Sequence, residues 1–351
     1  MGEVQLPKSH CYIAKAEHSF AISPLLQSHI LEFIANQPFE RGMDLLNSVL
    51  PGVNASSSQS QRLMQYYGNL EQTEELLVSP GFDTTETLSE KETHCEPILY
   101  VEVDGGHLPT DEGYQETKLG RIFVGHHRTQ KSSNKHKVEL RNELVESDYL
   151  AHLGNCKDFT ARFNKLVEAH LKQNPRLKMV SINDGADWIG KWLAESFPFA
   201  TVILDFYHAI EHLAEFAQIA LTSTKERTAW IDKCKEELLA GNIDKVINEI
   251  TLKSDNQQDS IIRKSEQLKN YYNKNRYRMK YNEYLSAGYC IGSGAIESAI
   301  STVVQQRCKL VGQRWTERVA AVLNIRAIFK SRKKEKLKDI INAKMGCKKA
   351  A

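Results

Sequence analysis

Three acidic residues in short, distinctive strings carry the clearest chemical signal in this chain. Asp104 follows the apolar run ILYVEV, Asp184 follows MVSIN, and Glu297 opens a helix after the Gly-rich turn GSG. Acids at the ends of strands and at the start of a helix can converge on one point in an α/β core. Three converging carboxylates suit a pair of divalent cations that assists in-line displacement at phosphate. We therefore predict that these acids support metal-dependent cutting and joining of nucleic-acid strands.

The bulk composition is that of a globular protein, and its charge is unevenly spread. The chain has 351 residues, enough for two or three domains, with 41% hydrophobic and 26% charged residues. The net charge of +2 does not by itself indicate nucleic acid. Acids are concentrated in Glu71–Glu96, however, and Lys and Arg dominate residues 330–351. This basic C-terminus predicts either a phosphate-contacting tail or a solvated terminal helix.

Cysteine usage and hydropathy bound the cellular location. The seven cysteines form no CxxC pair, which excludes a zinc ribbon and gives no disulfide framework. No apolar run approaches the ~18 residues of a membrane span, and the N-terminus lacks a signal pattern. We expect a cytoplasmic, nucleoid-associated protein with no membrane partner.

The first part of the chain predicts a small helical domain. Apolar spacing, Pro38 and Pro51-Gly52 delimit three short helices within residues 23–69. They are typical of a helix-turn-helix-like DNA-binding domain or, equally, of a plain helical bundle. Residues 1–22 hold two possible strands, GEVQL and HCYIAK, as the remnant of an N-terminal element, and residues 70–96 an acidic linker.

After the linker the periodicity becomes that of an α/β core. Two apolar strands come first, ending at Asp104 and near Gly125, with a loop expected between them from Gly105. Strands ending at Asp184 and at Asp205 then alternate with helices. We predict a mixed five-stranded sheet flanked by helices. The domain that contains this sheet is predicted to consist of residues 97–208 and 287–331. An all-helical insertion is expected over 209–286, and a basic tail over 332–351.

The end of the insertion mixes basic residues with tyrosines in KNYYNKNRYRMKYNEY. Such a mix can hold nucleic acid by phosphate contact and base stacking, although an amphipathic helix with solvated charges gives the same pattern. The DNA-binding residues predicted here are Lys269, Arg276, Arg278 and Lys280.

Taken together, DGG, NDGADW, LDFYHAIEHL, GSGAIES and QQRCKLVGQRW resemble bacterial insertion-sequence transposases of the Mutator-like group, over roughly residues 20–331. The resemblance implies a DDE enzyme with a ribonuclease H-like catalytic domain. Asp104, Asp184 and Glu297 would then bind two Mg²⁺ ions, or Mn²⁺ as a substitute. Asp205 and His208 match the family's Cys-or-Asp, two residues, then His element, for which we expect a support role.

The resemblance also implies the reaction and the partners. We expect metal-dependent 3′-end cleavage and strand transfer on double-stranded DNA, at the element ends and at the target, by a homodimer or larger assembly. Arg307, Arg314 and Trp315 are expected to contact phosphate or a base, or else to fix their helix to the core. The short segment before the helices, with Cys11 alone, indicates a truncated or shorter N-terminus than this family usually has.

Several alternatives compete with this interpretation. His208, Glu211 and His212 form a literal H-x-x-E-H pattern, as in some zinc peptidases, but no third ligand stands out. The GSG turn could hold a phosphate, yet it lacks the lysine of a P-loop. His126-His127 is either a ligand pair or a solvated turn. A transposase-derived DNA-binding protein that no longer transposes is the second functional class.

Overall fold

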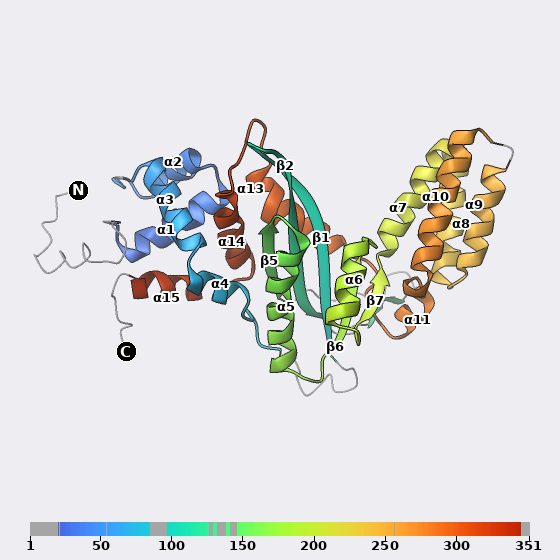
Figure 1. Ribbon diagram of the computed structural model, residues 1–351, viewed down its shortest axis with the longest axis horizontal. Helices are drawn as coiled ribbons and strands as arrows, with labels where there is room; N and C mark the ends of the chain where they lie inside the picture. Colours follow the sequence, from blue (N-terminus) through green and yellow to red (C-terminus); the bar gives the residue numbers. More distant parts are fainter. Residues whose placement is uncertain are drawn as a thin grey trace, which may run out of the picture.

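A five-stranded mixed sheet lies at the centre of the structure, with helices on both faces, as predicted (Figure 1). The computed structural model describes residues 20, 22–53, 55–84, 97–125, 129–131, 138–140, 146–255 and 257–344. The strand order is β5-β2-β1-β6-β7, with β1, β2 and β5 antiparallel and β6 and β7 parallel to β1. The strands are β1 (Ile98–Thr110), β2 (Gly113–Gly125), β5 (Ser147–Leu153), β6 (Lys178–Asn183) and β7 (Thr201–Leu204). A separate two-stranded ladder joins β3 (Thr129–Lys131) and β4 (Val138–Leu140).

The hairpin of β1 and β2 is longer than predicted, and the prediction of a loop after Asp104 was wrong. The two strands pair along their whole length, so Gly105 and Pro109 are strand residues and Asp104 lies inside β1 opposite Leu119. Gly and Pro are depleted in strands, which is why the sequence indicated a loop. The continuous antiparallel ladder overrides this local preference.

Alternation along β1 separates two faces of the sheet. Leu99, Val101 and Val103 pack with α5 (Cys156–Gln173) and α6 (Asp187–Ser196), which lie in front of the sheet in Figure 1. Tyr100 and the residues in step with it, Glu102 and Asp104, face the other way. Both acids therefore lie on the face that α7 (Phe206–Ala220) covers.

The helices predicted near the N-terminus are confirmed as α1 (Pro24–Asn36), α2 (Phe39–Val49) and α3 (Ser57–Gly68). Local signals explain them: Pro24 opens α1, and Ser56 and Gln59 form a capping box at α3. The stretch predicted as an acidic linker instead contains α4 (Glu71–Leu77), whose Leu76 and Leu77 are buried. The burial of these two leucines stabilises α4, which its acidic composition alone did not indicate.

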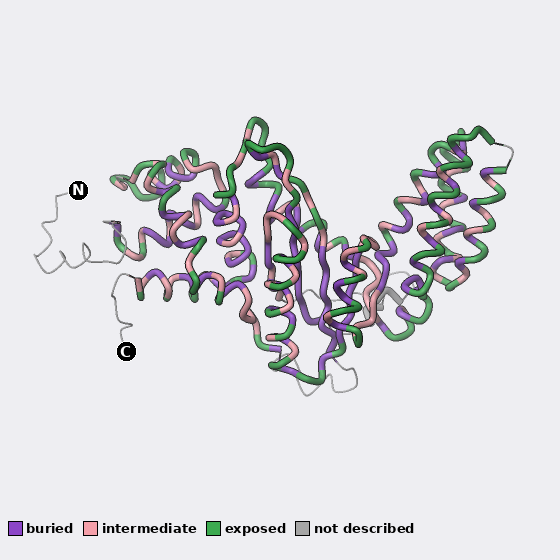
Figure 2. Tube along the Cα trace, in the orientation of Figure 1, coloured by how far each residue is buried: buried purple, intermediate pink, exposed green. Residues whose placement is uncertain are grey.

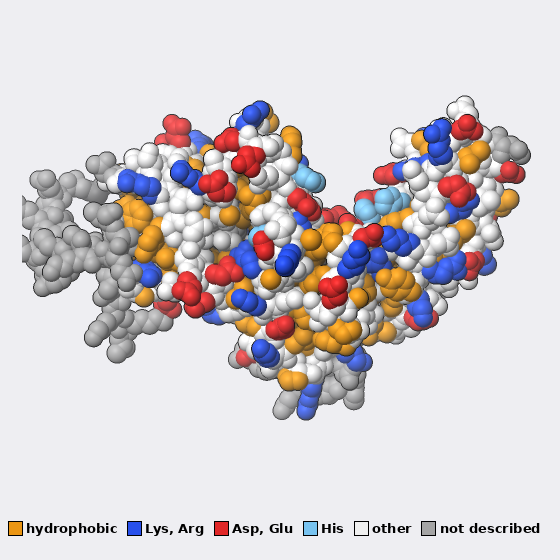
Figure 3. All heavy atoms as spheres, viewed as in Figure 1, with side chains coloured by type: hydrophobic (Ala, Val, Ile, Leu, Met, Phe, Trp, Pro, Cys, Tyr) orange, Lys and Arg blue, Asp and Glu red, His pale blue; other side chains and the backbone are white. Residues whose placement is uncertain are grey.

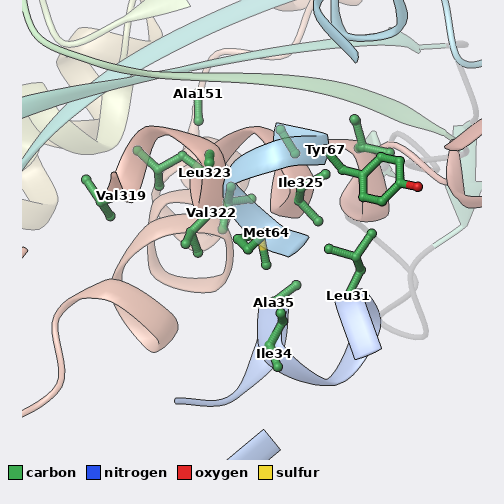
Figure 4. Close-up of a cluster of buried hydrophobic side chains, with 14 of the residues drawn as sticks. Leu31, Ile34, Ala35, Met64, Tyr67, Ala151, Val319, Val322, Leu323 and Ile325 are labelled. Carbon is green, nitrogen blue, oxygen red and sulfur yellow. The ribbon is translucent and has the colours of Figure 1, made fainter. Parts of the chain in front are cut away.

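The N-terminal helices share one hydrophobic core with the end of the chain. Figure 4 shows Leu31, Met64 and Tyr67 among Val322 and Ile325, and Figure 2 shows this buried side of the helices. The partner elements are α12 (Gly294–Ala299), the π-helical η3 (Ile300–Gln305), α13 (Gln306–Cys308), α14 (Val319–Lys330) and α15 (Lys334–Lys344). The helices α1–α4 therefore do not build a core of their own.

The residues between α7 and Glu297 form a helical arm, defined here as α7–α11, which projects from the body in Figure 1. Its remaining elements are α8 (Thr224–Leu239), α9 (Ile243–Ser254), α10 (Asp259–Asn275), η2 (Arg276–Arg278) and α11 (Tyr281–Ser286). Where it is described, the predicted insertion over 209–286 contains helices and turns and no strand.

Some predictions fall on residues that the structure does not describe. The two strands expected in residues 1–22, the pair His126-His127 and the last residues of the basic tail lie outside the described ranges. Across those ranges, no helix is long and apolar enough to cross a membrane.

A buried charge cluster fastens the start of α15, so the part of the predicted basic tail that the structure describes is mainly helical, and phosphate contact by it stays a prediction. Asp148 is fully buried and accepts hydrogen bonds from Gly81 N at 2.7 Å and from His170 Nε2 at 2.8 Å. Lys333 Nζ lies 3.0 Å from Asp148 Oδ1, and both side chains are shielded from water. Burial alone would raise the pKa of Asp148, but the hydrogen bond from His170 and the charge of Lys333 hold it below its ordinary value.

We expect Asp148→Asn to lower the free energy of unfolding by about 3–5 kcal/mol, because it leaves the Lys333 charge buried without its partner. Urea unfolding measures this loss. The pKa of Asp148 is lower in the folded than in the unfolded chain, so the contribution exists above the unfolded value of about 3.9. It is lost as the pH falls through the folded value. Glu146→Gln, which removes the exposed Glu146–Arg332 pair, should cost at most about 1 kcal/mol. Equal losses would contradict the assignment.

Candidate functional site

Strand register brings three aspartates to equivalent positions on neighbouring strands. Ile98 pairs with Lys178 across β1 and β6, an offset of 80 positions (178 − 98), and the same offset separates Asp104 from Asp184 (184 − 104). On β7, Leu204 pairs with Asn183, so Asp205 follows at the level of Asp184. In-register residues of parallel strands point to the same face. The acids are therefore aligned across the edge where β6 and β7 end.

The predicted site residues come together around one small cavity of about 180 Å³. Figure 3 shows the molecule hollowed between the β1–β2 end and the arm, with acidic and histidine side chains along the hollow. Glu297 enters from α12 and His208 from the first turn of α7. The cavity is lined by Val103, Asp104, Asp184, Asp205, His208, Ser293, Ile296 and Glu297.

The electrostatics of the cavity are those of crowded carboxylates. Burial, together with the smaller effects of the Asp184 and Glu297 charges, raises the pKa of Asp104 to about 6, although the hydrogen bond from Gly105 N opposes the rise. Burial likewise raises the pKa of Glu297, and Asp205 adds to the rise, while His208 opposes it. Negative charge gathered in this way favours a cation.

Asp205 acts as a clamp between α7 and the turn before Glu297. Its Oδ1 caps α7 by accepting from Tyr207 N at 2.6 Å and His208 N at 3.2 Å. Its Oδ2 accepts from Ser293 N at 2.8 Å and from Ser293 Oγ. A Cβ at Gly292 would lie 2.4 Å from the Tyr207 ring, so this glycine permits the close approach of the turn. Asp205 is thus engaged as a positioning residue.

The loop that carries Asp184 is held by the end of the arm. Tyr271 Oη donates to Asp184 O at 3.0 Å, and Arg278 donates to Asn183 Oδ1 at 3.2 Å and to Gly185 O at 3.4 Å. Arg278 is buried, which corrects its prediction as a surface DNA contact. The sequence reasoning missed Tyr271 and Asn183 as supports, because their partners lie far away along the chain.

The other arm residues predicted to bind DNA are placed on the surface as ion pairs. Arg276 makes a two-pronged contact with Asp244, and Lys269 and Lys280 pair with acids three positions away. The tyrosines of this stretch pack mostly inside the arm, with Tyr277 as the exposed one among those described. The stretch therefore fits the alternative of an amphipathic helix with solvated charges, and DNA binding by Lys269, Arg276 and Lys280 stays a prediction.

A buried ion pair lies directly behind Asp104 and was not predicted. Glu102, two residues earlier on the same face of β1, accepts from Arg121 Nη1 at 2.9 Å. The Arg121 guanidinium also lies 4.2 Å from the Phe123 ring and donates to Ser147 Oγ. Burial raises the pKa of Glu102 to about 7 against the influence of Arg121. The signal was present in ILYVEVD, where two acids alternate within an apolar strand.

The donor set fits divalent cations that prefer oxygen, although the acids are not drawn to one point. Within the described residues, no three His, Cys, Asp or Glu side chains are placed to hold one metal ion. Asp104 and Asp184 share a face, and Glu297 is exposed on the first turn of α12. Asp104 Oδ1 and Asp184 Oδ1 also accept from nearby backbone N–H groups. Carboxylate oxygens beside a cavity suit Mg²⁺ or Mn²⁺ in type.

The H-x-x-E-H pattern has different local partners. His208 Nδ1 lies 3.4 Å from Glu211 Oε2, and His212 Nδ1 lies 3.7 Å from Glu215 Oε2. The His212 ring packs on Tyr271, and burial lowers its pKa. No third metal-ligating side chain joins these histidines in the described part of the chain. Among the remaining predicted residues, Arg307 is buried, and Arg314 and Trp315 lie on the loop that follows α13.

The crowding of carboxylates can be tested by titration without divalent cations. We expect Asp184→Asn to lower the pKa of Asp104 from about 6 toward its ordinary value, because one neighbouring charge is removed while burial remains. NMR titration of labelled carboxyl carbons measures this. The control is Asp187→Asn, an exposed acid paired with Lys274, which should leave the Asp104 titration in place. An unchanged value in Asp184→Asn would disprove the proximity of the two acids.

The clamp can be tested by hydrogen exchange. Asp205→Ala removes the acceptor of Ser293 N and Oγ, so we expect exchange at Ser293 to accelerate by about tenfold or more. The cap of α7 is removed as well, at a cost of about 1–2 kcal/mol in unfolding free energy. Glu211→Ala, on the exposed side of the same helix, serves as the control. Protected exchange at Ser293 in Asp205→Ala would show that other contacts hold the turn.

Comparison with known proteins shows the family to which the chain belongs. A UPF0236 protein of Caldanaerobacter subterraneus subsp. tengcongensis is 25% identical over 212 residues, which cover 58% of this chain and 41% of that protein. A second UPF0236 protein of the same organism is 29% identical over 115 residues, covering 32% of this chain and 22% of the relative. The chain thus matches less than half the length of these relatives. The sequence profile of the uncharacterised protein family UPF0236 matches residues 74–338, and the chain therefore belongs to that family.

Proposed function

We propose that the protein is a DNA transposase of an insertion sequence, which cleaves 3′ ends and transfers strands with divalent cations. The observation that carries the proposal is the single cavity lined by Asp104, Asp184 and Glu297, with Asp205 and His208 beside them. Asp104 lies on β1, Asp184 just after β6, Asp205 and His208 at the start of α7, and Glu297 on α12. The outer two acids are 193 positions apart in sequence (297 − 104).

The sheet topology supports a ribonuclease H-like interpretation of the fold. Three antiparallel strands are followed by two parallel ones in the order β5-β2-β1-β6-β7, with Asp104 on β1 and Asp184 directly after the adjacent parallel strand β6. The arm is inserted just before Glu297, where the resembled family also has a helical insertion. Helices α1–α3 would form the helix-turn-helix-like part, and DNA at the element ends and at the target would be the partner of a dimeric or larger complex.

Some of the site residues would bind the cations, and others position the residues that do. When bound, two Mg²⁺ ions would activate a water or a 3′-hydroxyl and stabilise the leaving oxygen. Asp104, Asp184 and Glu297 would provide their ligands. Asp205 keeps Glu297 near the sheet through Ser293, and Tyr271 and Arg278 hold the carbonyl groups of Asp184 and Gly185.

The names of the relatives add independent support. The name of one joins eleven locus designations of a single bacterium, and that of another joins four. A gene that is copied within a genome would be carried at many loci. A transposase encoded by its own mobile element has this property.

The proposal is tested by a cleavage assay with Mg²⁺ or Mn²⁺ on DNA that flanks the gene. Asp184→Asn should reduce 3′-end cleavage by about a hundredfold or more, since even partners of metal ligands cost 10–100-fold. Folding and DNA binding should persist. The matched control Asp187→Asn, three positions away and exposed, should cleave like the wild type. Full cleavage by Asp184→Asn would refute the assignment, and a wild type that binds DNA without cutting it would favour the non-transposing alternative.

A further inference from the structure

A second and larger cavity lies away from the acids, between α2, α3 and the loop after α13. Its volume is about 740 Å³. The loop is fixed to the tip of the β1–β2 hairpin by two backbone hydrogen bonds: Trp315 N donates to Pro109 O at 3.1 Å, and Asp111 N donates to Trp315 O at 2.9 Å. The walls therefore come from three separate parts of the chain and form a preshaped pocket.

The wall contains a buried guanidinium with spare donors. Arg307 is fully buried, and its Nε donates to Ile34 O at 3.0 Å, but its Nη1 and Nη2 have no hydrogen-bond partner. The rings of Phe39 and Trp315 each lie 5.0 Å from the guanidinium. Burial lowers the pKa of Arg307 to about 10, which marks how costly the charge is there. The rings offset part of that cost, and an anion that accepted from the free edge would offset more.

The rim of the cavity has the same sign of charge. Arg62 on α3 and Arg314 and Arg318 on the loop also line it and are exposed. In the part of the chain that the structure describes, neither these three nor Arg307 forms an ion pair. The acid among the lining residues is Asp111, so four arginines face one carboxylate. Such a balance selects an anionic ligand.

We propose that this cavity binds a backbone phosphate of the DNA substrate, with the Arg307 edge and the rim arginines Arg62, Arg314 and Arg318 as donors. The inference rests on the proposed function and names a subsite for it. The planar edge of a guanidinium matches two phosphate oxygens, which a point charge such as Lys does not. A volume far larger than one phosphate leaves room for the attached sugars.

Arg307 and Glu297 are joined by a continuous helical segment, which links the proposed subsite to the acidic cavity. The two residues are ten positions apart on one uninterrupted helical run through α12, η3 and α13. Ten residues rise at most roughly 15 Å along a helix, and less where the run is π-helical. The bound phosphate would thus lie on the same stretch of DNA as the bond that is cut.

The first measurement uses inorganic phosphate and the full chain. Phosphate should raise the Tm of the wild type by about 2 °C relative to chloride at equal ionic strength. Arg314→Gln combined with Arg318→Gln, on the exposed rim, should abolish this shift while keeping the Tm in chloride. Arg307→Lys should abolish most of it, because the charge remains but the fork does not. The matched control is Arg276→Gln, an exposed arginine on the arm, which should retain the full shift.

The second measurement identifies DNA as the source of the phosphate. A labelled duplex from the DNA flanking the gene should bind the rim double variant about tenfold or more weakly. The slope of log affinity against log salt should fall by about 1 for each phosphate that the variant no longer neutralises. Single methylphosphonates placed in turn along the strand on either side of the cleaved bond should include one that weakens binding to the wild type and leaves binding to the rim double variant nearly unchanged.

The outcomes separate this proposal from the proposed function. No phosphate shift in the wild type, or unaltered DNA affinity in the rim double variant, overturns the proposal even if the enzyme cleaves DNA. A phosphate shift that the duplex does not compete away assigns the cavity to a free anion and overturns the DNA assignment. If Asp184→Asn cleaves like the wild type while both binding results hold, the cavity stands and the catalytic assignment fails.

Discussion

Parallel pairing in one register is the constraint on which the candidate site depends. The pairing of β1, β6 and β7 brings Asp104, Asp184 and Asp205 level with one another, although no local feature of the sequence joins them. A slip by one residue would turn each acid to the other face of the sheet. The register is fixed by the apolar residues on both faces of β1. The hydrophobic core thus determines where negative charge accumulates.

The acids of the cavity differ in how free they are. Both carboxylate oxygens of Asp205 are occupied by backbone and Ser293 donors, whereas Glu297 lies exposed. The arm contributes more than bulk, because Tyr271 and Arg278 bond the loop around Asp184. Behind Asp104, the Glu102–Arg121 pair adds a further carboxylate whose charge Arg121 partly compensates. The site is therefore held by contacts from every side of the sheet edge.

Local signals predicted what local interactions determine. Apolar spacing, Pro38 and Pro51-Gly52 predicted three short helices within residues 23–69, which α1, α2 and α3 confirm, and the apolar runs predicted the mixed sheet. The extension of β1 through Gly105 depends on its partner strand, and the helix α4 depends on burial of Leu76. The roles of individual arginines could not be predicted either, because their partners lie far away along the chain. Arg307 bonds a carbonyl 273 positions away and Arg278 a side chain 95 positions away.

Two buried arginines make the N-terminal helices inseparable from the rest of the molecule. Arg307 and Arg326 donate to Ile34 O and Ala35 O, the open carbonyls at the end of α1, where positive charge is favoured. Arg326 also donates to Thr302 O and Val303 O within the π-helical turn. A fragment that began at β1 would leave both guanidinium groups without these acceptors and would expose part of the shared core to water. Truncation before β1 would therefore destabilise the helical run that carries Glu297.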